Sequence, residues 1–271
     1  MWQYTQHSMK PFRSFSQPIK KNIHYVLTDI DDTLSLSGKL TAAAFSAMEQ
    51  LAENNIQVVP ITGRPAGWCD HIARMWPVAG VVGENGAFYF RYDDARKNML
   101  RRYFASEKER QENRQKLTKL KHDILEKVPG SGVSADQFYR EADLAIDFCE
   151  DVPLLTQDAV DRIVGIFEAA GAQAKISSIH VNGWFGHYDK LAMAKLFFED
   201  VFDLQLSTCK DQVIFIGDSP NDCPMFAFFP HAVGVANILD FKDRLEHEPA
   251  WITDEPGGHG FAEMTDILLT R

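Results

Sequence analysis

The sequence predicts an α/β fold, in which helices cover a parallel sheet and a second α+β unit is inserted into the chain. Short apolar runs alternate with amphipathic helical segments in residues 23–87, and the same alternation returns after residue 187. Residues 88–186 contain instead an aromatic, basic stretch and a long charged segment. Several apolar runs end in acidic or amide residues, at the position where open parallel sheets bind ligands.

The first half of the sheet is predicted from three apolar runs separated by two helical segments. A buried strand at residues 23–27 is followed by helical periodicity that begins behind Thr41, a suitable N-cap. The apolar side chains of this helix fall on one stripe, as a helix covering a sheet requires. Strands at residues 56–61 and 78–82, with a helix at residues 66–75 between them, complete a β-α-β-α-β succession.

The middle region is predicted to be an inserted α+β unit. Residues 88–103 indicate a hairpin with Asp93-Asp94 at its turn, and residues 106–127 form one long, charged helical stretch. A strand at residues 144–149 and a helix at residues 156–170, which Gly171 would terminate, come next. One or two further strands are expected in residues 175–185.

Elements like those of the first half return after residue 187. A helix is expected at residues 190–202, strands at 213–216 and 232–236, and a short helix from Phe261. We therefore expect one core domain formed by residues 23–87 and 187–271, with an inserted domain at residues 88–186. Residues 1–22 are polar and interrupted by Pro11 and Pro18, which predicts a flexible N-terminal extension.

The composition is that of an ordinary globular protein, with 45% hydrophobic and 24% charged residues. Because 28 Lys and Arg face 38 Asp and Glu, a nucleic-acid or anionic-membrane partner is disfavoured, whereas a small anionic substrate is not. No apolar run is long enough to span a membrane. The four cysteines show no metal or disulfide spacing, which fits a cytoplasmic protein. A monomer and a homodimer are equally compatible with the sequence.

Two carboxylates stand at the end of the first predicted strand. Because side chains alternate along a strand, Asp29 and Asp31 point to the same side of the sheet. Carboxylates this close repel each other unless a cation or a proton lies between them, and such oxygen ligands favour Mg2+. The pair suits attack on phosphorus, with one Asp as nucleophile and the other as proton donor and acceptor. Taken alone, an Asp-rich turn is the alternative.

The other strand ends favour the chemical interpretation. Thr62 follows the second strand, the segment Glu84-Asn85-Gly86 follows the third, and Asp218 and Asp222 follow residues 213–216. The carboxyl ends of parallel strands meet at one edge of a sheet, so these side chains should lie together. A chance turn explains one such ending, but several at matching positions indicate one site.

These residues give the chain a resemblance to the haloacid dehalogenase (HAD) superfamily. Its four ordered motifs match Asp29-Ile30-Asp31-Asp32-Thr33-Leu34, Thr62-Gly63-Arg64, Lys190 and Gly217-Asp218-Ser219-Pro220-Asn221-Asp222. The segment Glu84-Asn85-Gly86-Ala87 and the large insertion resemble subclass IIB, which includes Cof-type sugar phosphatases and the phosphatases of sucrose phosphate and mannosylphosphoglycerate. The resemblance runs from residue 23 to the C-terminus, and it implies a Rossmann-like core (the HAD fold) with an inserted cap domain of type C2B.

The resemblance also implies a role for each matching residue. Asp29 would attack phosphorus and form an aspartyl-phosphate, and Asp31 would protonate the leaving oxygen and then activate water. Mg2+ would be held by Asp29, the backbone carbonyl of Asp31 and Asp218, with Asp222 adjacent. Lys190 would complete the catalytic set. The residues expected to contact phosphate or substrate are Thr62, Gly63, Arg64, Asn85, Lys190, Asn221, His187 and Trp184.

Some of these residues also have a purely structural interpretation. Lys190 stands at a helix start, where solvated lysines are common, and Thr62 is a suitable helix cap. Arg64 fits a structural ion pair as well as a phosphate contact. Asp32, where some family members carry Gly, is expected to face away from the site. The same choice between substrate contact and packing applies to Arg140, Glu150, Trp184 and His187.

We therefore expect a cytoplasmic, Mg2+-dependent phosphatase that acts on a small phosphorylated metabolite, with a sugar phosphate as the expected substrate. A phosphomutase or phosphotransferase is the first alternative, because subclass IIB also includes phosphomannomutases. The second is a non-catalytic binding protein on the same scaffold, against which the intact set of Asp29, Asp31, Lys190 and Asp218 argues. A dehalogenase is disfavoured, because it would need neither the general acid nor the metal carboxylates.

Overall fold

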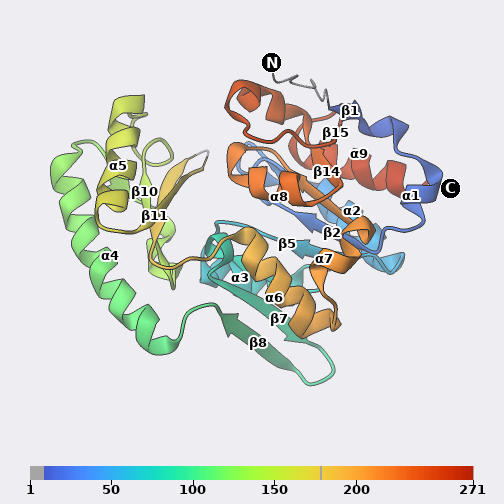
Figure 1. The fold of residues 1–271 in the computed structure, drawn as a ribbon, viewed down its shortest axis with the longest axis horizontal. Helices are drawn as coiled ribbons and strands as arrows, with labels where there is room; N and C mark the ends of the chain where they lie inside the picture. The colour runs from blue at the N-terminus through green and yellow to red at the C-terminus, as the bar shows by residue number, and fades with distance from the viewer. Residues whose placement is uncertain (1–8, 178, 271) are drawn as a thin grey trace, which may run out of the picture.

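A parallel sheet forms the centre of the structure, a computed structural model that describes residues 9–177 and 179–270 (Figure 1). The strand order across this sheet is β1, β15, β14, β13, β2, β5. The strands are β1 (Lys10–Pro11), β2 (Tyr25–Thr28), β5 (Gln57–Pro60), β13 (Val213–Gly217), β14 (His231–Gly234) and β15 (Trp251–Ile252). A parallel bridge between Ile61 and Val82 attaches β6 (Val81–Gly83) beyond β5. The predicted parallel α/β core is confirmed.

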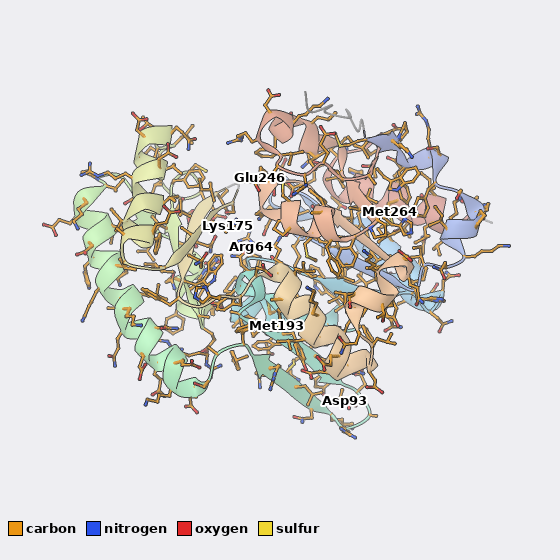
Figure 2. The ribbon with its side chains drawn as sticks, in the orientation of Figure 1. Arg64, Asp93, Lys175, Met193, Glu246 and Met264 are labelled. Carbon is orange, nitrogen blue, oxygen red and sulfur yellow. The ribbon has the colours of Figure 1, made fainter. Side chains whose placement is uncertain are left out.

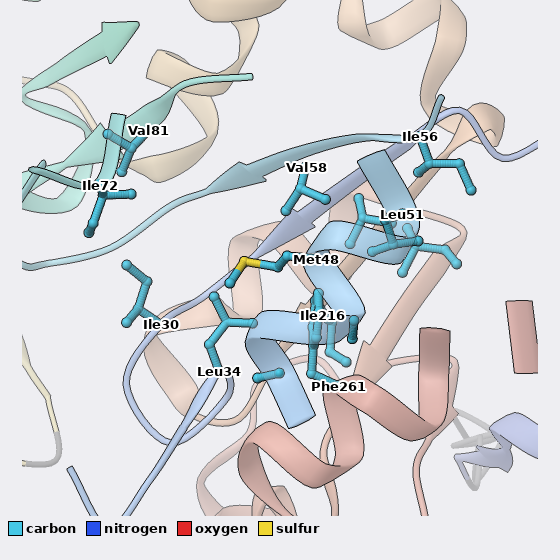
Figure 3. Packing of buried hydrophobic residues seen from close by; sticks show 14 of the residues in the cluster. Ile30, Leu34, Met48, Leu51, Ile56, Val58, Ile72, Val81, Ile216 and Phe261 are labelled. Atoms are coloured by element: carbon cyan, nitrogen blue, oxygen red, sulfur yellow. The ribbon is translucent and has the colours of Figure 1, made fainter. Parts of the chain in front are cut away.

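Helices cover both faces of the sheet, because successive side chains of each strand point to opposite faces. On one face, Val26 of β2 packs into a hydrophobic cluster in which Met48 and Phe261 lie close to Ile216 (Figure 3). On the other face, Leu27 packs into a second cluster. The first cluster is covered by α2 (Ala42–Glu53), α3 (Ala66–Met75) and α9 (Gly257–Leu269). The second is covered by α6 (Lys190–Phe202), α7 (Leu206–Cys209) and α8 (Cys223–Phe228).

The inserted unit has its own antiparallel sheet, with the strand order β11, β12, β10, β9. Its helices α4 and α5 lie on the side of this sheet away from the parallel sheet (Figure 1). Ile146 of β10 and Phe167 of α5 are fully buried in a separate hydrophobic cluster, so the unit packs around its own core. Its elements are α4 (Glu107–Lys127), β9 (Gly132–Val133), β10 (Asp143–Asp147), α5 (Gln157–Ala169), β11 (Gln173–Ile176) and β12 (His180–Trp184).

Two boundaries differ from those expected. The hairpin of β7 (Phe88–Asp93) and β8 (Asn98–Tyr103) pairs with β6 and buries the rings of Phe88 and Phe90 in the first cluster of the core, not in the inserted unit. Helix α9 begins at Gly257 instead of Phe261, because the glycines serve close packing rather than a loop. Gly257 has a φ of +50°, and a Cβ on Gly258 would collide with the backbone of the loop after β2.

The expectation of a flexible N-terminal extension is wrong for residues 9–22, and residues 1–8 lie outside the described part. Strand β1 pairs with β15 at the edge of the sheet, and helix α1 (Gln17–Lys20) follows. Pro11 is tolerated there, since an edge strand does not need every N–H. The rings of Phe12 and Phe15 are buried and pack on Trp251. Because Pro11 and Pro18 interrupt this segment, the sequence pattern does not indicate that Phe12 and Phe15 are buried.

A small hairpin, β3 (Ser35–Leu36) and β4 (Lys39–Leu40), follows β2 before helix α2 begins. Its turn contains Ser37 and Gly38, both with positive φ. The predicted cap at Thr41 is confirmed, because its hydroxyl accepts a hydrogen bond from the N–H of Ala44 at 3.1 Å. In the described residues, no helix combines the length and the apolar character needed to cross a lipid bilayer.

Candidate active site

The predicted strand ends meet at one edge of the parallel sheet. Asp29 directly follows β2, and its N–H donates to the carbonyl of Ile216 in the neighbouring strand at 2.9 Å. Asp218 directly follows β13. The N–H of Thr62 donates to Val82 O at 2.9 Å, which keeps the ends of β5 and β6 together. Strand pairing therefore brings residues that are distant in sequence to one place.

Three carboxylates and one lysine form the buried centre of this edge. Oxygen atoms of Asp29, Asp218 and Asp222 lie within 4.8 Å of one another. Lys190, the first residue of α6, places its Nζ 2.6 Å from Asp29 Oδ1 and 2.8 Å from Asp222 Oδ1. The absence of a side chain at Gly217 leaves room for the Asp222 carboxylate, because a Cβ there would collide with it. Lys190 is thus a buried ion-pair partner and not a solvated surface lysine.

The carboxylates of this centre outnumber the cation that they share. Burial, together with the neighbouring Asp222 and Asp31, raises the pKa of Asp29 to about 7, although Lys190 acts in the opposite direction. Burial and the neighbouring Asp29 and Asp222 also raise the pKa of Asp218 well above its usual range. A divalent cation would supply the missing positive charge, and clustered carboxylate oxygens are the donors that Mg2+ takes. The residues present therefore fit Mg2+.

Asp31, expected as the proton donor, faces Arg64. The guanidinium contacts the Asp31 carboxylate through Nε at 3.0 Å and Nη2 at 2.7 Å. Arg64 also stacks on Trp68, with 4.5 Å between its Cζ and the ring centre. Its Nη1 lies 3.7 Å from Asp136 of the inserted unit. Arg64 therefore holds Asp31 at the point where the inserted unit meets the core.

The loop after β5 has mostly a positioning role in this structure. Thr62 is fully buried, and its hydroxyl accepts the N–H of Arg64 at 3.0 Å within the loop. It does not cap helix α3, whose N-cap is Pro65. Gly63 and Asn85 line the cavity above the carboxylates. Asn221 lines it as well, and its side-chain oxygen accepts a hydrogen bond from the Ser219 hydroxyl at 2.9 Å.

Trp184 and His187 lie beside a neighbouring cavity rather than the one above Asp29 and Asp31. The Trp184 ring is only 2% exposed and stacks on Tyr188, with 5.8 Å between ring centres. A ring buried to this extent offers no face to a sugar, so the packing interpretation holds for Trp184.

The inserted unit contributes further residues to the cavity above the carboxylates. Arg140, already considered for this role, lies there together with Lys175, Ser177, Ile179, His180 and Asn182. Figure 2 shows Lys175 and Arg64 at the junction of the two units. Lys175, Ser177, Ile179, His180 and Asn182 come from β11, β12 and the turn between them, where no motif marks them. Glu150, the other candidate in this unit, lies 2.9 Å from His180 Nε2.

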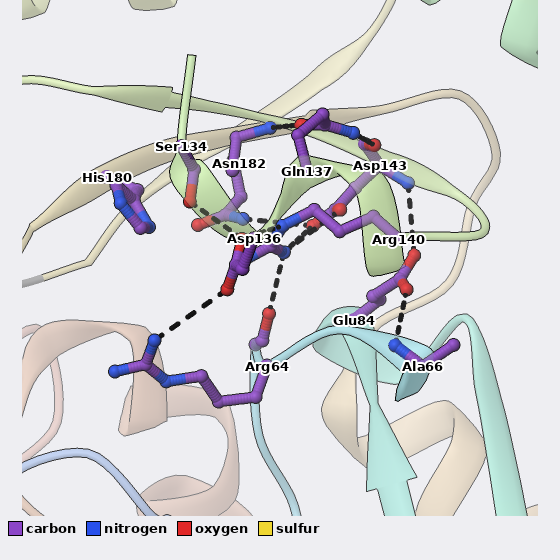
Figure 4. A network of polar contacts seen from close by, with 12 residues as sticks. Arg64, Ala66, Glu84, Ser134, Asp136, Gln137, Arg140, Asp143, His180 and Asn182 are labelled. Carbon is purple, nitrogen blue, oxygen red and sulfur yellow. Dashed lines mark hydrogen bonds and ion pairs between the residues drawn. The ribbon is translucent and has the colours of Figure 1, made fainter. Parts of the chain in front are cut away.

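Glu84 and Arg140 join the two units through a buried polar network (Figure 4). The Glu84 carboxylate accepts hydrogen bonds from Ala66 N, at the start of α3, and from the N–H groups of residues 141–143 in the inserted unit. Arg140 donates to the carbonyl of Gly63 at 2.9 Å and pairs with Asp143 at 3.1 Å. The motif segment that contains Glu84 was noticed in the sequence, but this linking role was not.

Comparison with known proteins supports the family that the motifs indicate. A model of haloacid dehalogenase-like hydrolases matches residues 26–141. No curated protein matches the sequence. Among solved structures, a Thermoplasma acidophilum protein is 17% identical over 91% of this chain and 98% of its own, with a TM-score of 0.68.

Two further solved structures have the same fold. A haloacid dehalogenase-like hydrolase from Bacteroides thetaiotaomicron is 15% identical over 90% of this chain and 98% of its own, with a TM-score of 0.63. A sugar phosphatase of HAD subclass IIB is 13% identical over 89% of this chain and 97% of its own, with a TM-score of 0.60. The likeness thus extends over the core and the inserted unit.

Proposed function

Because a model of haloacid dehalogenase-like hydrolases matches residues 26–141 and solved structures share the fold, we propose that the protein is a Mg2+-dependent phosphatase of a small phosphorylated metabolite. The observation that carries the proposal is the buried contact of Lys190 with Asp29 and Asp222, beside Asp218. A lysine and a metal-binding carboxylate set together stabilise the charge that develops on a transferring phosphoryl group. The proposed substrate class is a sugar phosphate, and the proposed location is the cytoplasm.

Different residues of the site would bind the metal and the phosphoryl group. Asp29, Asp218 and Asp222 would hold Mg2+, which when bound neutralises charge on the phosphoryl oxygens. The Lys190 ammonium would bind the same phosphoryl group, because its burial between carboxylates fixes its position. The inserted unit would act as a cap that excludes water from the cavity.

The chemistry would proceed in two displacements at phosphorus. In the first, an Asp29 oxygen forms a bond to phosphorus, the ester P–O bond breaks, and the leaving oxygen takes a proton from Asp31. In the second, a water oxygen bonds to phosphorus, the bond to Asp29 breaks, and Asp31 takes the proton of the water. The sum consumes one water and releases an alcohol and phosphate, and both aspartates return to their starting state. Asp31 would enter the first displacement in its protonated form, and contact with Arg64 would hold its side chain toward the leaving oxygen.

The test is phosphate release from a panel of sugar phosphates, with and without Mg2+, by the wild-type protein and by Asp29→Asn. Loss of the nucleophile should lower turnover by about 10³-fold or more. Asp32→Asn is the matched control: it makes the same change three residues away, at a positive φ that Asn tolerates. It should keep most of the activity.

Folded wild-type protein that releases no phosphate from a broad panel would contradict the proposal. Release that requires a catalytic amount of a sugar bisphosphate would indicate a mutase instead. Equal activity of Asp29→Asn and the wild-type protein would exclude the aspartyl-phosphate route.

A further inference from the structure

A second cavity adjoins the candidate active site, and it is larger and less polar than the one above the carboxylates. It has a volume of about 490 Å³, within the range of small-molecule sites. Its walls are the β3–β4 hairpin, helix α3 and the segment 135–139 of the inserted unit. The lining includes Ile30, Leu40, Trp68, Ile72, Trp76 and Tyr139.

Two of its aromatic side chains are exposed to an extent unusual for such large rings. Trp68 is 44% exposed and Tyr139 is 54% exposed, although both line a cavity. Exposed apolar side chains that gather around one hollow mark a binding site, whereas single ones are ordinary on a protein surface. Aromatic walls of this kind suit a ring, because ring faces stack at little cost in conformational entropy.

The cavity lies on the side of the site where a leaving group would be. Asp31 and Arg64 line both cavities, so the two meet at the proposed proton donor. An ester oxygen that receives its proton from Asp31 must lie beside that carboxylate. The rest of the leaving group then extends from Asp31 toward the aromatic walls.

The two aromatic walls come from different units and are held close together. Gly67 at the start of α3 allows this approach, because a Cβ there would lie 2.9 Å from Tyr139 Cβ. Trp68 is the next residue of the same helix, so Tyr139 and Trp68 bound the cavity from the inserted unit and from the core. A ring between them would contact both units at once.

We propose that this cavity binds a ring of the substrate's leaving group against Trp68 and Tyr139. The inference rests on the proposed phosphatase function and adds the substrate class: a phosphate ester whose alcohol carries a ring with an apolar face. Aromatic rings and the flat faces of sugar rings share this chemistry.

Two esters of similar leaving-group acidity test the proposal: 2-phenylethyl phosphate and ethyl phosphate. In the wild-type protein, kcat/KM should be at least tenfold higher for the ring ester. Tyr139→Ala should lower kcat/KM for the ring ester about tenfold, which corresponds to about 1.4 kcal/mol, and leave ethyl phosphate unchanged. Phe138→Ala, which removes the adjacent and 91% exposed ring, is the matched control and should change neither.

Glucose 6-phosphate serves as the third ester and distinguishes the two kinds of ring. A larger loss for glucose 6-phosphate than for 2-phenylethyl phosphate in Tyr139→Ala would assign the cavity to a sugar, and the reverse to an aromatic group. Equal losses for ethyl phosphate and the ring esters, or no loss for either ring ester, would overturn the proposal.

Calorimetric binding of the same esters to Asp29→Asn protein separates this inference from the function on which it rests. Ring esters should bind about tenfold more tightly than ethyl phosphate, and the added Tyr139→Ala change should remove the difference. This result, together with an absence of turnover in the wild-type protein, would contradict the phosphatase function and support the ring-binding cavity. Turnover without any ring preference in binding would support the phosphatase function and contradict the ring-binding cavity.

Discussion

Lys190 is the residue on which the electrostatic balance of the site depends. It is 5% exposed and contacts two of the three clustered carboxylates. Burial alone would lower its pKa, but Asp222 and Asp29 raise the pKa above that of an ordinary lysine, so the ammonium stays charged. Removing one partner of a buried ion pair leaves the other charges uncompensated, which is far more harmful than losing a surface pair.

Lys190→Met should therefore lower turnover by about 10²- to 10³-fold, as expected for one electrostatic contact to the transition state. The measurement is phosphate release at saturating Mg2+. Lys195→Met provides the control, because Lys195 lies on the same helix and is exposed near the ring of Phe228. If Lys190→Met and Lys195→Met were equally active, the lysine would have no part in the chemistry.

The carboxylates and Lys190 could be predicted from the sequence because each follows a recognisable strand end or motif. Asp29 and Asp218 needed only the rule that ligands bind at the carboxyl ends of parallel strands. Tyr139 could not be found in this way, and for Arg140 the sequence left open whether it contacts substrate or serves packing. Arg140 contacts Gly63 across 77 residues of sequence, and no local pattern records such a contact. Trp184 was ambiguous for the opposite reason, since a strand tryptophan has the same sequence signal in a core and in a binding site.

At the scale of elements, the link between the core and the inserted unit depends on Glu84. Its carboxylate is fully buried and receives backbone N–H groups from Ala66 and from residues 141–143. Burial and Asp143 raise the pKa of Glu84 to about 8, whereas Arg140 and these N–H donors lower it. One side chain thus accepts hydrogen bonds from the first N–H of α3 and from the N–H groups at the start of β10.

Glu84→Ala should lower the free energy of unfolding by about 2–4 kcal/mol, because several buried N–H groups lose their acceptor. Denaturant unfolding measures this change. The control is Glu141→Ala, which removes only an exposed pair with Arg114 and should change stability by about 0–1 kcal/mol. Equal stability of the two variants would show that water replaces the carboxylate without loss.

Most helices of the core and of the inserted unit were predictable within a few residues, because apolar periodicity and caps define them locally. Helix α3 has the predicted bounds, and α4 begins one residue after its predicted start. The start of α9 was missed because Gly257 and Gly258 have the signature of a loop. Their tight packing against the loop after β2 is a tertiary constraint. The sequence groups the hairpin β7–β8 with the inserted unit, because the core residues on which it packs are not its neighbours in sequence.

At the scale of the whole molecule, the N-terminal segment of the chain forms one edge of the parallel sheet. Strand β1 adds the edge next to β15, so the first described residues and the last quarter of the sequence share one layer. Phe12 is 1% exposed, stacks on Phe15 at 4.7 Å and meets Trp251 edge-on at 6.3 Å. Because these rings are buried, the N-terminal segment is part of the hydrophobic core.

Phe12→Ala should therefore destabilise the protein by about 3–5 kcal/mol, the usual consequence of truncating a buried Phe. Denaturant unfolding with the intact chain measures this change, and Phe138→Ala supplies the matched control, because that ring is 91% exposed. Turnover per folded molecule should stay unchanged, since the ring lies outside both cavities of the site. A loss of stability no greater than that of Phe138→Ala would mean that the N-terminal segment is dispensable. In that case the core of the sheet would end at β15.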